Sequence, residues 1–206
     1  SRWLIFSGIA AVIYLKVDQV MLGLMIDDQA VGIYAAAAKL SEVWYFFPAA
    51  IVVSFFPQLI NKKQNDMSGY RLDLQKINDL LYCCGILTAV FVSLSASWFL
   101  PLLFGNAYSE AIPVLVVHVW AGVFVFMRTL LSKWLITENQ LKLSMVSQVL
   151  GALINVVLNM HLIPLYGPLG AAYATVISHA VSGYVVLFCH RDLWPMAMLV
   201  TRSILL

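Results

Sequence analysis

The stretch "GIAAVIYLKVDQVMLGLM", residues 8–25, decides what kind of fold this chain can form. A membrane-spanning helix takes about 20 mostly apolar residues, and this stretch qualifies except that Lys16 and Asp18 interrupt it. A central charge in a membrane helix costs about 2.5–3.5 kcal/mol on insertion scales, so a partner or a water-filled cavity must compensate it. Residues two apart on a helix differ by about 200°. Lys16 and Asp18 therefore point to nearly opposite sides and cannot pair directly.

The composition of the whole chain points to the same environment. Of its 206 residues, 62% are hydrophobic and only 11% are charged, whereas soluble domains carry roughly a quarter charged residues. The net charge of +2 is too small to favour nucleic-acid binding. The sequence contains no P-loop, no glycine-rich phosphate loop and no metal-ligand cluster. It therefore predicts no metal site, no cofactor, no soluble enzyme domain and no ATP-hydrolysing pump within this chain, and leaves open an ATPase on a separate chain.

The hydropathy pattern predicts an all-α integral membrane protein with a six-helix transmembrane bundle over residues 1–190. Residues 191–206 then form a cytoplasmic edge or the start of a further helix. Because the chain does not begin with Met, we expect a piece of a longer protein. The predicted spans are residues 3–25, 32–59, 80–103, 112–136, 143–163 and 171–189.

Charged residues between the spans fall into two groups that predict the orientation. Alternate connections hold only acidic charges, at Asp27, Asp28 and Glu110. Lys and Arg concentrate on the cytoplasmic side of membrane proteins, which places both ends of this segment in the cytoplasm. The basic group comprises Arg2, Lys62, Lys63, Arg71, Lys76, Lys142 and Arg191.

Five ionisable residues lie well inside predicted spans: Lys16, Asp18, Lys39, Glu42 and Arg128. In one interpretation the first four neutralise one another between helices. Either Asp18 pairs with Lys39, or Lys16 pairs with Glu42. In the other, at least one lysine faces an aqueous cavity and binds an anion. We expect Lys16 to face the cleft and Asp18 to face Lys39. Arg128 has no acid near it in its own span, so it needs a distant partner or water, and its guanidinium suits phosphate or carboxylate.

Three further features leave alternatives open. Ser144, Gln148, Gly151, Asn155 and Asn159 form one helical stripe, which serves either helix packing or cavity lining. Pro48, inside the second span, predicts a kink that is either a hinge or static. The polar segment 70–84 has partly helical spacing and is either an interfacial helix or a solvated loop.

Several motifs together resemble the second lobe of the O-antigen and polysaccharide flippases. The opening "KVDQVMLGLM…VGIYAAAAKLSEVWYFFPAAI" and the connection "LFGNAYSEAIPVL" both look like that family. The most specific match is "INVVLNMHLIPLYGPLGAAYAT", residues 154–175. The wider superfamily, which includes multidrug exporters and the lipid II flippase, has Asn, Pro, Gly and small residues at these places. The similarity covers about residues 1–190.

The resemblance implies one lobe of a two-lobe, MATE-like transporter whose N-terminal lobe is missing here. It implies an undecaprenyl-pyrophosphate-linked oligosaccharide repeat unit, as in O-antigen and lipopolysaccharide biosynthesis, moved across the bacterial inner membrane by alternating access. Lys16, Lys39 and Arg128 would meet the pyrophosphate. Asp18 and Glu42 would hold those cations or couple transport to H⁺ or Na⁺. The polysaccharide polymerase machinery is an expected partner.

Two other functions remain open at this point. A multidrug exporter of the same superfamily would carry cations and needs an acidic cavity, whereas the central charges here are three basic and two acidic. A membrane-embedded polymerase or acyltransferase would need a catalytic constellation, often on a large periplasmic loop, and the loops here are short. The charge balance favours an anionic substrate.

Overall fold

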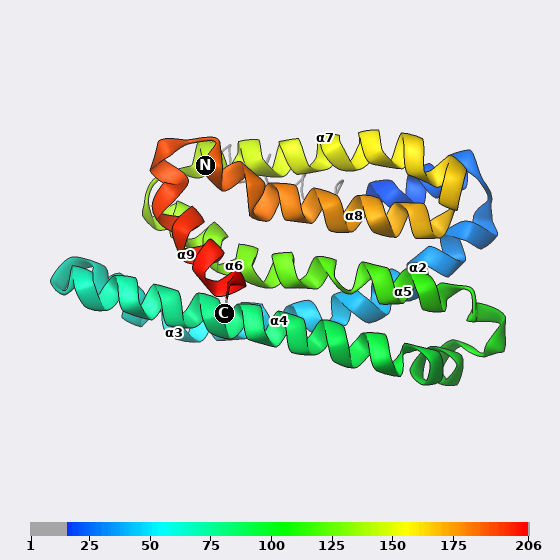
Figure 1. The fold of residues 1–206 in the computed structure, drawn as a ribbon, viewed down its shortest axis with the longest axis horizontal. Coiled ribbons are helices and arrows are strands. Elements are labelled where there is room, and N and C mark those ends of the chain that lie inside the picture. The colour runs from blue at the N-terminus through cyan, green and yellow to red at the C-terminus, as the bar shows by residue number, and fades with distance from the viewer. Residues whose placement is uncertain (1–15, 206) are drawn as a thin grey trace.

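The computed structural model describes residues 16–205, and within them every regular element is a helix (Figure 1). Residues 16–25 are helical and lead into α2 through a turn at residues 26–27. The helices that follow are α2 (Asp28–Glu42), η1 (Val43–Tyr45), α3 (Phe46–Asn65), α4 (Met67–Phe104), η2 (Asn106–Tyr108), α5 (Ala111–His118), α6 (Ala121–Thr137), α7 (Leu141–Tyr166), α8 (Pro168–Gly183), η3 (Val185–Phe188), η4 (Arg191–Leu193) and α9 (Trp194–Ile204).

The long helices run back and forth along the longest axis of the molecule, with turns at both ends (Figure 1). α8 is central, because it packs against α7, α6, α5 and α2. α4 packs against α3, α5 and α6 and forms the opposite edge, where α9 crosses it. The predicted all-α membrane bundle is therefore confirmed.

Five helices of the described part are long and apolar enough to cross a membrane. They cover Asp28–Asn65, Met67–Phe104, Ala111–Thr137, Leu141–Tyr166 and Pro168–Phe188. These correspond to the second to sixth predicted spans. The predicted span over residues 3–25 lies mostly outside the described residues, so the count of six stays a prediction.

The third span begins far earlier than residue 80. α4 has 38 residues, which makes it about 57 Å long, against a hydrocarbon thickness of about 30 Å. Asp66 caps its start by accepting a hydrogen bond from the Gly69 amide at 3.0 Å. Tyr70, Leu74 and Ile77 are buried on one face of this extension. The solvated loop is therefore wrong, because the polar segment is helical and continuous with the span; whether it lies at the membrane interface stays a prediction.

The second span is interrupted where Pro48 predicts a kink. A short 3-10 turn, Val43–Tyr45, separates α2 from α3, and Pro48 is buried in the first turn of α3. Proline is tolerated in a first helical turn because its missing N–H would be unsatisfied there anyway. Whether this interruption acts as a hinge stays a prediction.

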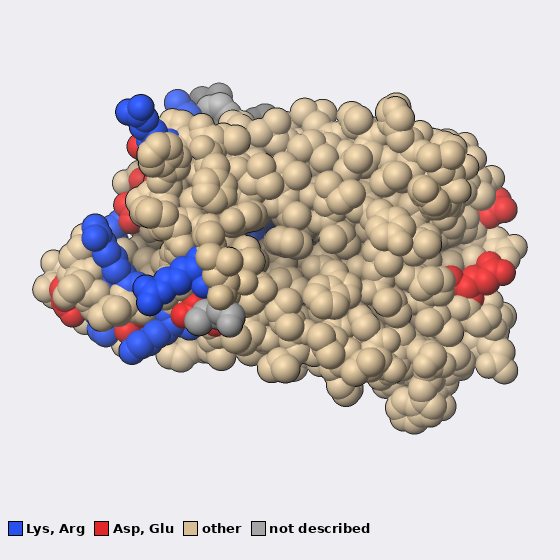
Figure 2. Space-filling view, in the orientation of Figure 1, with Lys and Arg blue, Asp and Glu red and all other residues tan. Residues whose placement is uncertain are grey.

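Charged side chains sit at the two ends of the bundle, with a broad uncharged belt between them on the face that Figure 2 shows. At the end where residues 26–27 and the α7–α8 turn lie, the charged side chains that are visible are all acidic. Lys and Arg gather at the other end. This separation matches the predicted grouping of the connections. That the basic end is cytoplasmic stays a prediction.

The turn from α7 to α8 brings two backbones into close contact at Gly170. A Cβ atom there would overlap the carbonyl oxygen of Leu162 on α7. We predict that Gly170→Ala lowers the stability of the full protein by about 1–3 kcal/mol, the usual cost of overpacking. Thermal unfolding in detergent measures this. Gly32→Ala is the control, because nothing lies within 4 Å of its added Cβ; equal losses in both variants would contradict the close approach.

Candidate functional site

The carboxylate of Asp18 is buried inside the bundle, with 3% of the residue exposed. Its Oδ2 accepts hydrogen bonds from the Tyr34 hydroxyl at 2.7 Å and the Thr175 hydroxyl at 2.9 Å. Its Oδ1 accepts one from the Asn159 side-chain amide at 2.6 Å. These bonds join the first helix to α2, α7 and α8. They also satisfy an acceptor that would otherwise be costly to bury.

The topology explains why these four residues meet. Asp18 and Tyr34 lie 16 residues apart, symmetrically about residue 26, where the first helix turns into α2. Asn159 and Thr175 lie symmetrically about Gly167, whose φ of 58° permits the tight α7–α8 turn. Two antiparallel helices joined by a short turn place residues at equal distance from the turn side by side. Eight residues correspond to about 12 Å of helix, so both pairs sit at the same depth.

Two asparagines extend the polar cluster beyond the carboxylate. Asn159 also donates to the Asn155 side-chain oxygen at 3.1 Å. Both residues are fully buried. The Oδ1 of Asn159 and the Nδ2 of Asn155 have no hydrogen-bond partner among residues 16–205. Carboxylate and amide oxygens are ligands that hard cations prefer, but Asn159 turns its amide nitrogen, and not its oxygen, toward Asp18.

The expected pairing of Asp18 with Lys39 is wrong. The Asp18 carboxylate faces α7 and α8, where neutral donors surround it, and Lys39 is exposed instead. Lys16 is exposed as well, and Glu42 is half-buried. Among residues 16–205, none of these four groups forms an ion pair within 4.0 Å. Mutual neutralisation by direct pairing is therefore not what retains these charges.

Arg128 connects three helices through neutral partners. Its Nη1 donates to the Ser182 carbonyl at 2.6 Å, and its Nη2 donates to the Ser147 hydroxyl at 2.9 Å. Ser182 lies in the last turn of α8, where carbonyls lack helical partners and a cation is favourable. α6 is thus fastened to α7 and α8. A role for Arg128 in anion binding stays a prediction, and any anion must compete with these bonds.

The stripe on α7 faces the bundle interior. Ser144, Gly151, Asn155 and Asn159 are buried, and Gln148 is half-buried. At Gly151 the helices approach closely, since an added Cβ would lie 2.7 Å from the Ser182 Cβ on α8. Only Asn159 reaches Asp18 directly. The stripe thus combines a packing contact at one level with the polar cluster at another.

A second polar pair lies next to the cluster. The Ser41 hydroxyl on α2 and the His118 Nδ1 on α5 are 2.6 Å apart, and both residues are buried. The His118 ring meets the Tyr34 ring edge-on, with centroids 5.5 Å apart. Sequence reasoning missed Tyr34, Thr175 and Ser41 as members of this site. Equal spacing about the two turns is the signal that identifies the first two.

One family model and several known proteins are similar to this chain. A family model described as "Polysaccharide biosynthesis protein" matches residues 1–63. Two relatives come from Haloferax volcanii. "Probable low-salt glycan biosynthesis flippase Agl15" is 23% identical over 92% of this chain and 40% of its own length. "Probable flippase AglR" is 29% identical over 80% of this chain and 35% of its own length. The chain thus spans about two fifths of these relatives.

Two solved structures share the fold. An outward-facing multidrug resistance MATE family transporter of the MOP superfamily aligns with a TM-score of 0.74 and 18% identity. That alignment covers 89% of this chain and 42% of the transporter chain. A MOP superfamily transporter from Pyrococcus furiosus aligns with a TM-score of 0.76 and 16% identity, covering 98% of this chain and 50% of the other. This chain therefore matches up to half of each of these transporters.

The donors around Asp18 lead to a stability prediction. Tyr34→Phe removes one hydrogen bond to a buried carboxylate, and such bonds to charged groups are worth about 1.5–3 kcal/mol. We expect the full protein in detergent to lose about that much stability. Tyr173→Phe is the matched control, because Tyr173 is 41% exposed and should change stability by less than about 0.5 kcal/mol. A Tyr34→Phe protein as stable as the control would contradict the bond.

Proposed function

We propose that this chain is part of a polysaccharide flippase of the MOP transporter superfamily, and that the full protein moves a lipid-linked oligosaccharide between membrane leaflets by alternating access. It is a transporter and not an enzyme. The family-model match covers residues 1–63, which include the first helix and α2 with all four of their central charges. The missing lobe of the same chain would form the other wall of the cavity.

One observation carries this proposal: Lys16 and Lys39 are exposed although both lie within apolar helices. An exposed ammonium in hydrocarbon has no compensation, so these lysines need an aqueous cavity. Their neighbour Asp18 is buried on the opposite side of the first helix and takes no part in neutralising them by direct contact. Two exposed cations in apolar helices, neither of which forms an ion pair with the described residues, suit an anionic headgroup.

The substrate that fits these cations carries phosphate at its lipid end. We propose an undecaprenyl-pyrophosphate-linked repeat unit, such as that of O-antigen, in the bacterial inner membrane. A pyrophosphate crosses hydrocarbon poorly and requires cations along its path, whereas its polyprenyl tail can stay in the bilayer. The polysaccharide polymerase machinery is the partner that would take up the product.

Asp18 is the candidate for ion coupling. Its carboxylate is buried, and its hydrogen-bond donors among the described residues, the Tyr34 and Thr175 hydroxyls and the Asn159 amide, are uncharged. An ionised carboxylate buried without a cation is strongly disfavoured, so a proton or Na⁺ bound here would stabilise the site. Binding of either ion would change the charge at the point where both hairpins meet, and would therefore bias the lobe between conformations.

Export of cationic drugs is the nearest alternative, since a solved structure with this fold is a multidrug transporter. A cationic substrate would require accessible acids. Here the central acids are the buried Asp18 and the half-buried Glu42, whereas the central lysines are exposed. The accessible charge therefore favours an anionic substrate.

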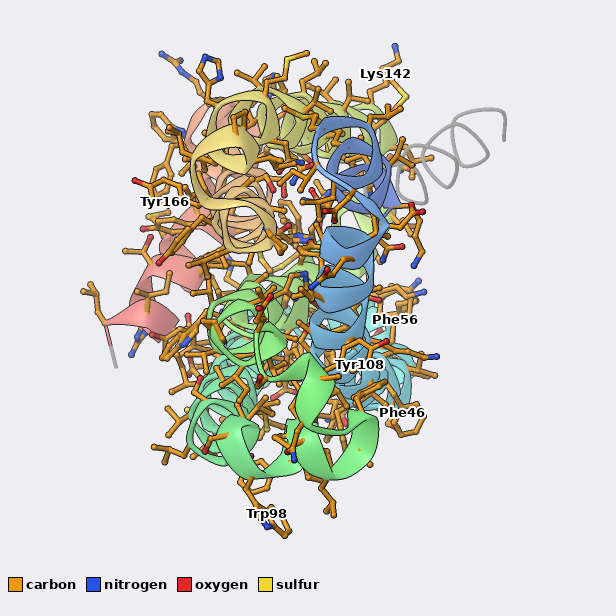
Figure 3. The ribbon with its side chains drawn as sticks, turned by 90° about the vertical axis from the view of Figure 1, so that its right-hand side faces the viewer. Phe46, Phe56, Trp98, Tyr108, Lys142 and Tyr166 are labelled. Carbon is orange, nitrogen blue, oxygen red and sulfur yellow. The ribbon has the colours of Figure 1, made fainter. Side chains whose placement is uncertain are left out.

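The exposed lysines give a direct functional test. In a host lacking the gene, lipid-linked repeat units should accumulate on the cytoplasmic side, and the intact gene should relieve this. We predict that Lys16→Ala with Lys39→Ala lowers the flipping rate about tenfold or more, because charge-assisted bonds worth about 1.5–3 kcal/mol are lost. Lys142→Ala is the control, since Lys142 lies at the end of the bundle and points away from it (Figure 3).

Several outcomes would overturn this proposal. Full rescue by the double-lysine variant would refute the cationic cavity. Normal surface polysaccharide in the deletion strain would refute the flippase, and increased sensitivity to cationic drugs would support the exporter instead. A protein-level measurement in membranes confirms that each variant is expressed.

The buried carboxylate predicts how transport depends on ions. Reconstituted full protein should flip faster under an imposed Na⁺ or H⁺ gradient, and Asp18→Asn should abolish that acceleration because the amide cannot take up the charge. Asp28→Asn provides the control, since Asp28 is an exposed acid in the first turn of α2. If neither gradient changes the flipping rate of the wild-type protein, coupling at Asp18 is excluded.

A further inference from the structure

At the basic end of the molecule, α4, the end of α6 and α9 surround a hollow of about 970 Å³. Figure 2 shows Lys and Arg side chains gathered at this end, around a depression in the surface. Cations from three helices line the hollow: Lys63, Arg71, Lys76 and Arg202. Three acids line it as well: Asp79, Glu138 and Asp192.

All three acids already have partners, while three of the four cations have none among residues 16–205. Glu138 forms an ion pair with Lys63 at 2.7 Å. Asp79 accepts hydrogen bonds from Ser203 and Gln75.

Asp192 lies 3.7 Å from the His190 ring and accepts a bond from Gln140. By contrast, Arg71, Lys76 and Arg202 form no hydrogen bond or ion pair with the described part of the chain. The hollow therefore presents three cations that are available to a ligand.

The depth of these cations matches the lipid headgroups. Lys76 precedes the apolar stretch that begins at Leu80 by four residues, which is about 6 Å along α4. The headgroup layer extends about 5–8 Å beyond the hydrocarbon on each side of a bilayer. Arg71 lies little more than one turn further out, within reach of a long side chain that extends along the helix.

Apolar side chains share the hollow with the cations. Met67, Leu72 and Met198 line it and are 49%, 61% and 67% exposed. α9 buries one face against the bundle and leaves Trp194 exposed at 49% on its other side. Basic and large apolar side chains together, at the edge of the bilayer, are typical of a surface that meets lipid.

We propose that this hollow binds the phosphate headgroup of an anionic membrane phospholipid, with the acyl chains against its apolar wall. Arg71 on α4 and Arg202 on α9 approach the phosphate from two sides, and each guanidinium offers paired donors to phosphate oxygens. Lys76 adds a third positive charge at headgroup level. An acidic peptide would match the charge but not the exposed methionines and leucine. The lipid fastens α9 to the extended end of α4.

Native mass spectrometry of the full protein tests this proposal with phosphatidylglycerol and phosphatidylcholine added in parallel. Wild type should retain phosphatidylglycerol in preference to phosphatidylcholine. Each cation near an anionic membrane surface contributes about fivefold in binding, so Arg71→Gln with Arg202→Gln should weaken phosphatidylglycerol retention about 25-fold. The control is Arg191→Gln with Lys142→Gln, which removes the same charge from exposed positions outside the hollow.

The remaining outcomes overturn the proposal. Equal retention of both lipids, or equal loss in the control, would show that the hollow does not recognise the headgroup. Inorganic phosphate that displaces the lipid at millimolar concentration would identify a free-anion site instead. Capture of an acidic peptide with no preference between the lipids would assign the surface to a protein partner. None of these results depends on transport activity, so the flippase proposal stands or fails separately.

Discussion

Burial of the Asp18 carboxylate is the constraint on which the arrangement of the lobe depends. An ionised carboxylate is among the most expensive groups to remove from water, and its cost here is reduced by donors from three different helices. Because Tyr34 and Asn159 belong to separate hairpins, the carboxylate joins the two hairpins at a common depth. The Tyr34 hydroxyl also lies 3.0 Å from the Thr175 hydroxyl, so the connection has a second link. Helix α8, which packs against four other helices, supplies part of this junction through Thr175.

The two-residue spacing of Lys16 and Asp18 was informative from sequence, and the partners of Asp18 were not. Helical geometry alone places the two charges on opposite sides, and the structure buries Asp18 and exposes Lys16. The predicted partner of Asp18, Lys39, was wrong because the prediction looked for an opposite charge. Neutral hydrogen-bond donors are enough to satisfy the buried carboxylate. Those donors lie on helices 141 and 157 residues away, and periodicity within one helix carries no information about such contacts. Equal spacing about residues 26 and 167 does carry it, once each pair of helices is recognised as a hairpin.

Arg128 and the start of α4 illustrate two other limits of sequence reasoning. The sequence suggested a distant partner or water for Arg128, but the end of a helix also offers unpaired carbonyl oxygens, and Ser182 supplies one. For α4, hydropathy locates the apolar part of a helix and not its end. The cap at Asp66 was the available signal, since an aspartate three residues before Gly69 accepts its amide hydrogen. Where a helix extends beyond the membrane, its capping residue and not its hydropathy marks where the helix begins.

Opposite placement of acid and base on one helix has a mechanical consequence for the proposed transport cycle. Lys16 and Asp18 are separated by about 3 Å along the helix axis, so they move as one rigid unit. A proton or cation that neutralises Asp18 alters the junction with Tyr34 and Asn159, and any resulting rotation of the first helix carries Lys16 with it. Tyr34 belongs to the helix that bears Lys39, so both exposed lysines are tied to the same buried carboxylate. Ion binding and headgroup binding are then linked through two helices, without any relay of intermediate residues.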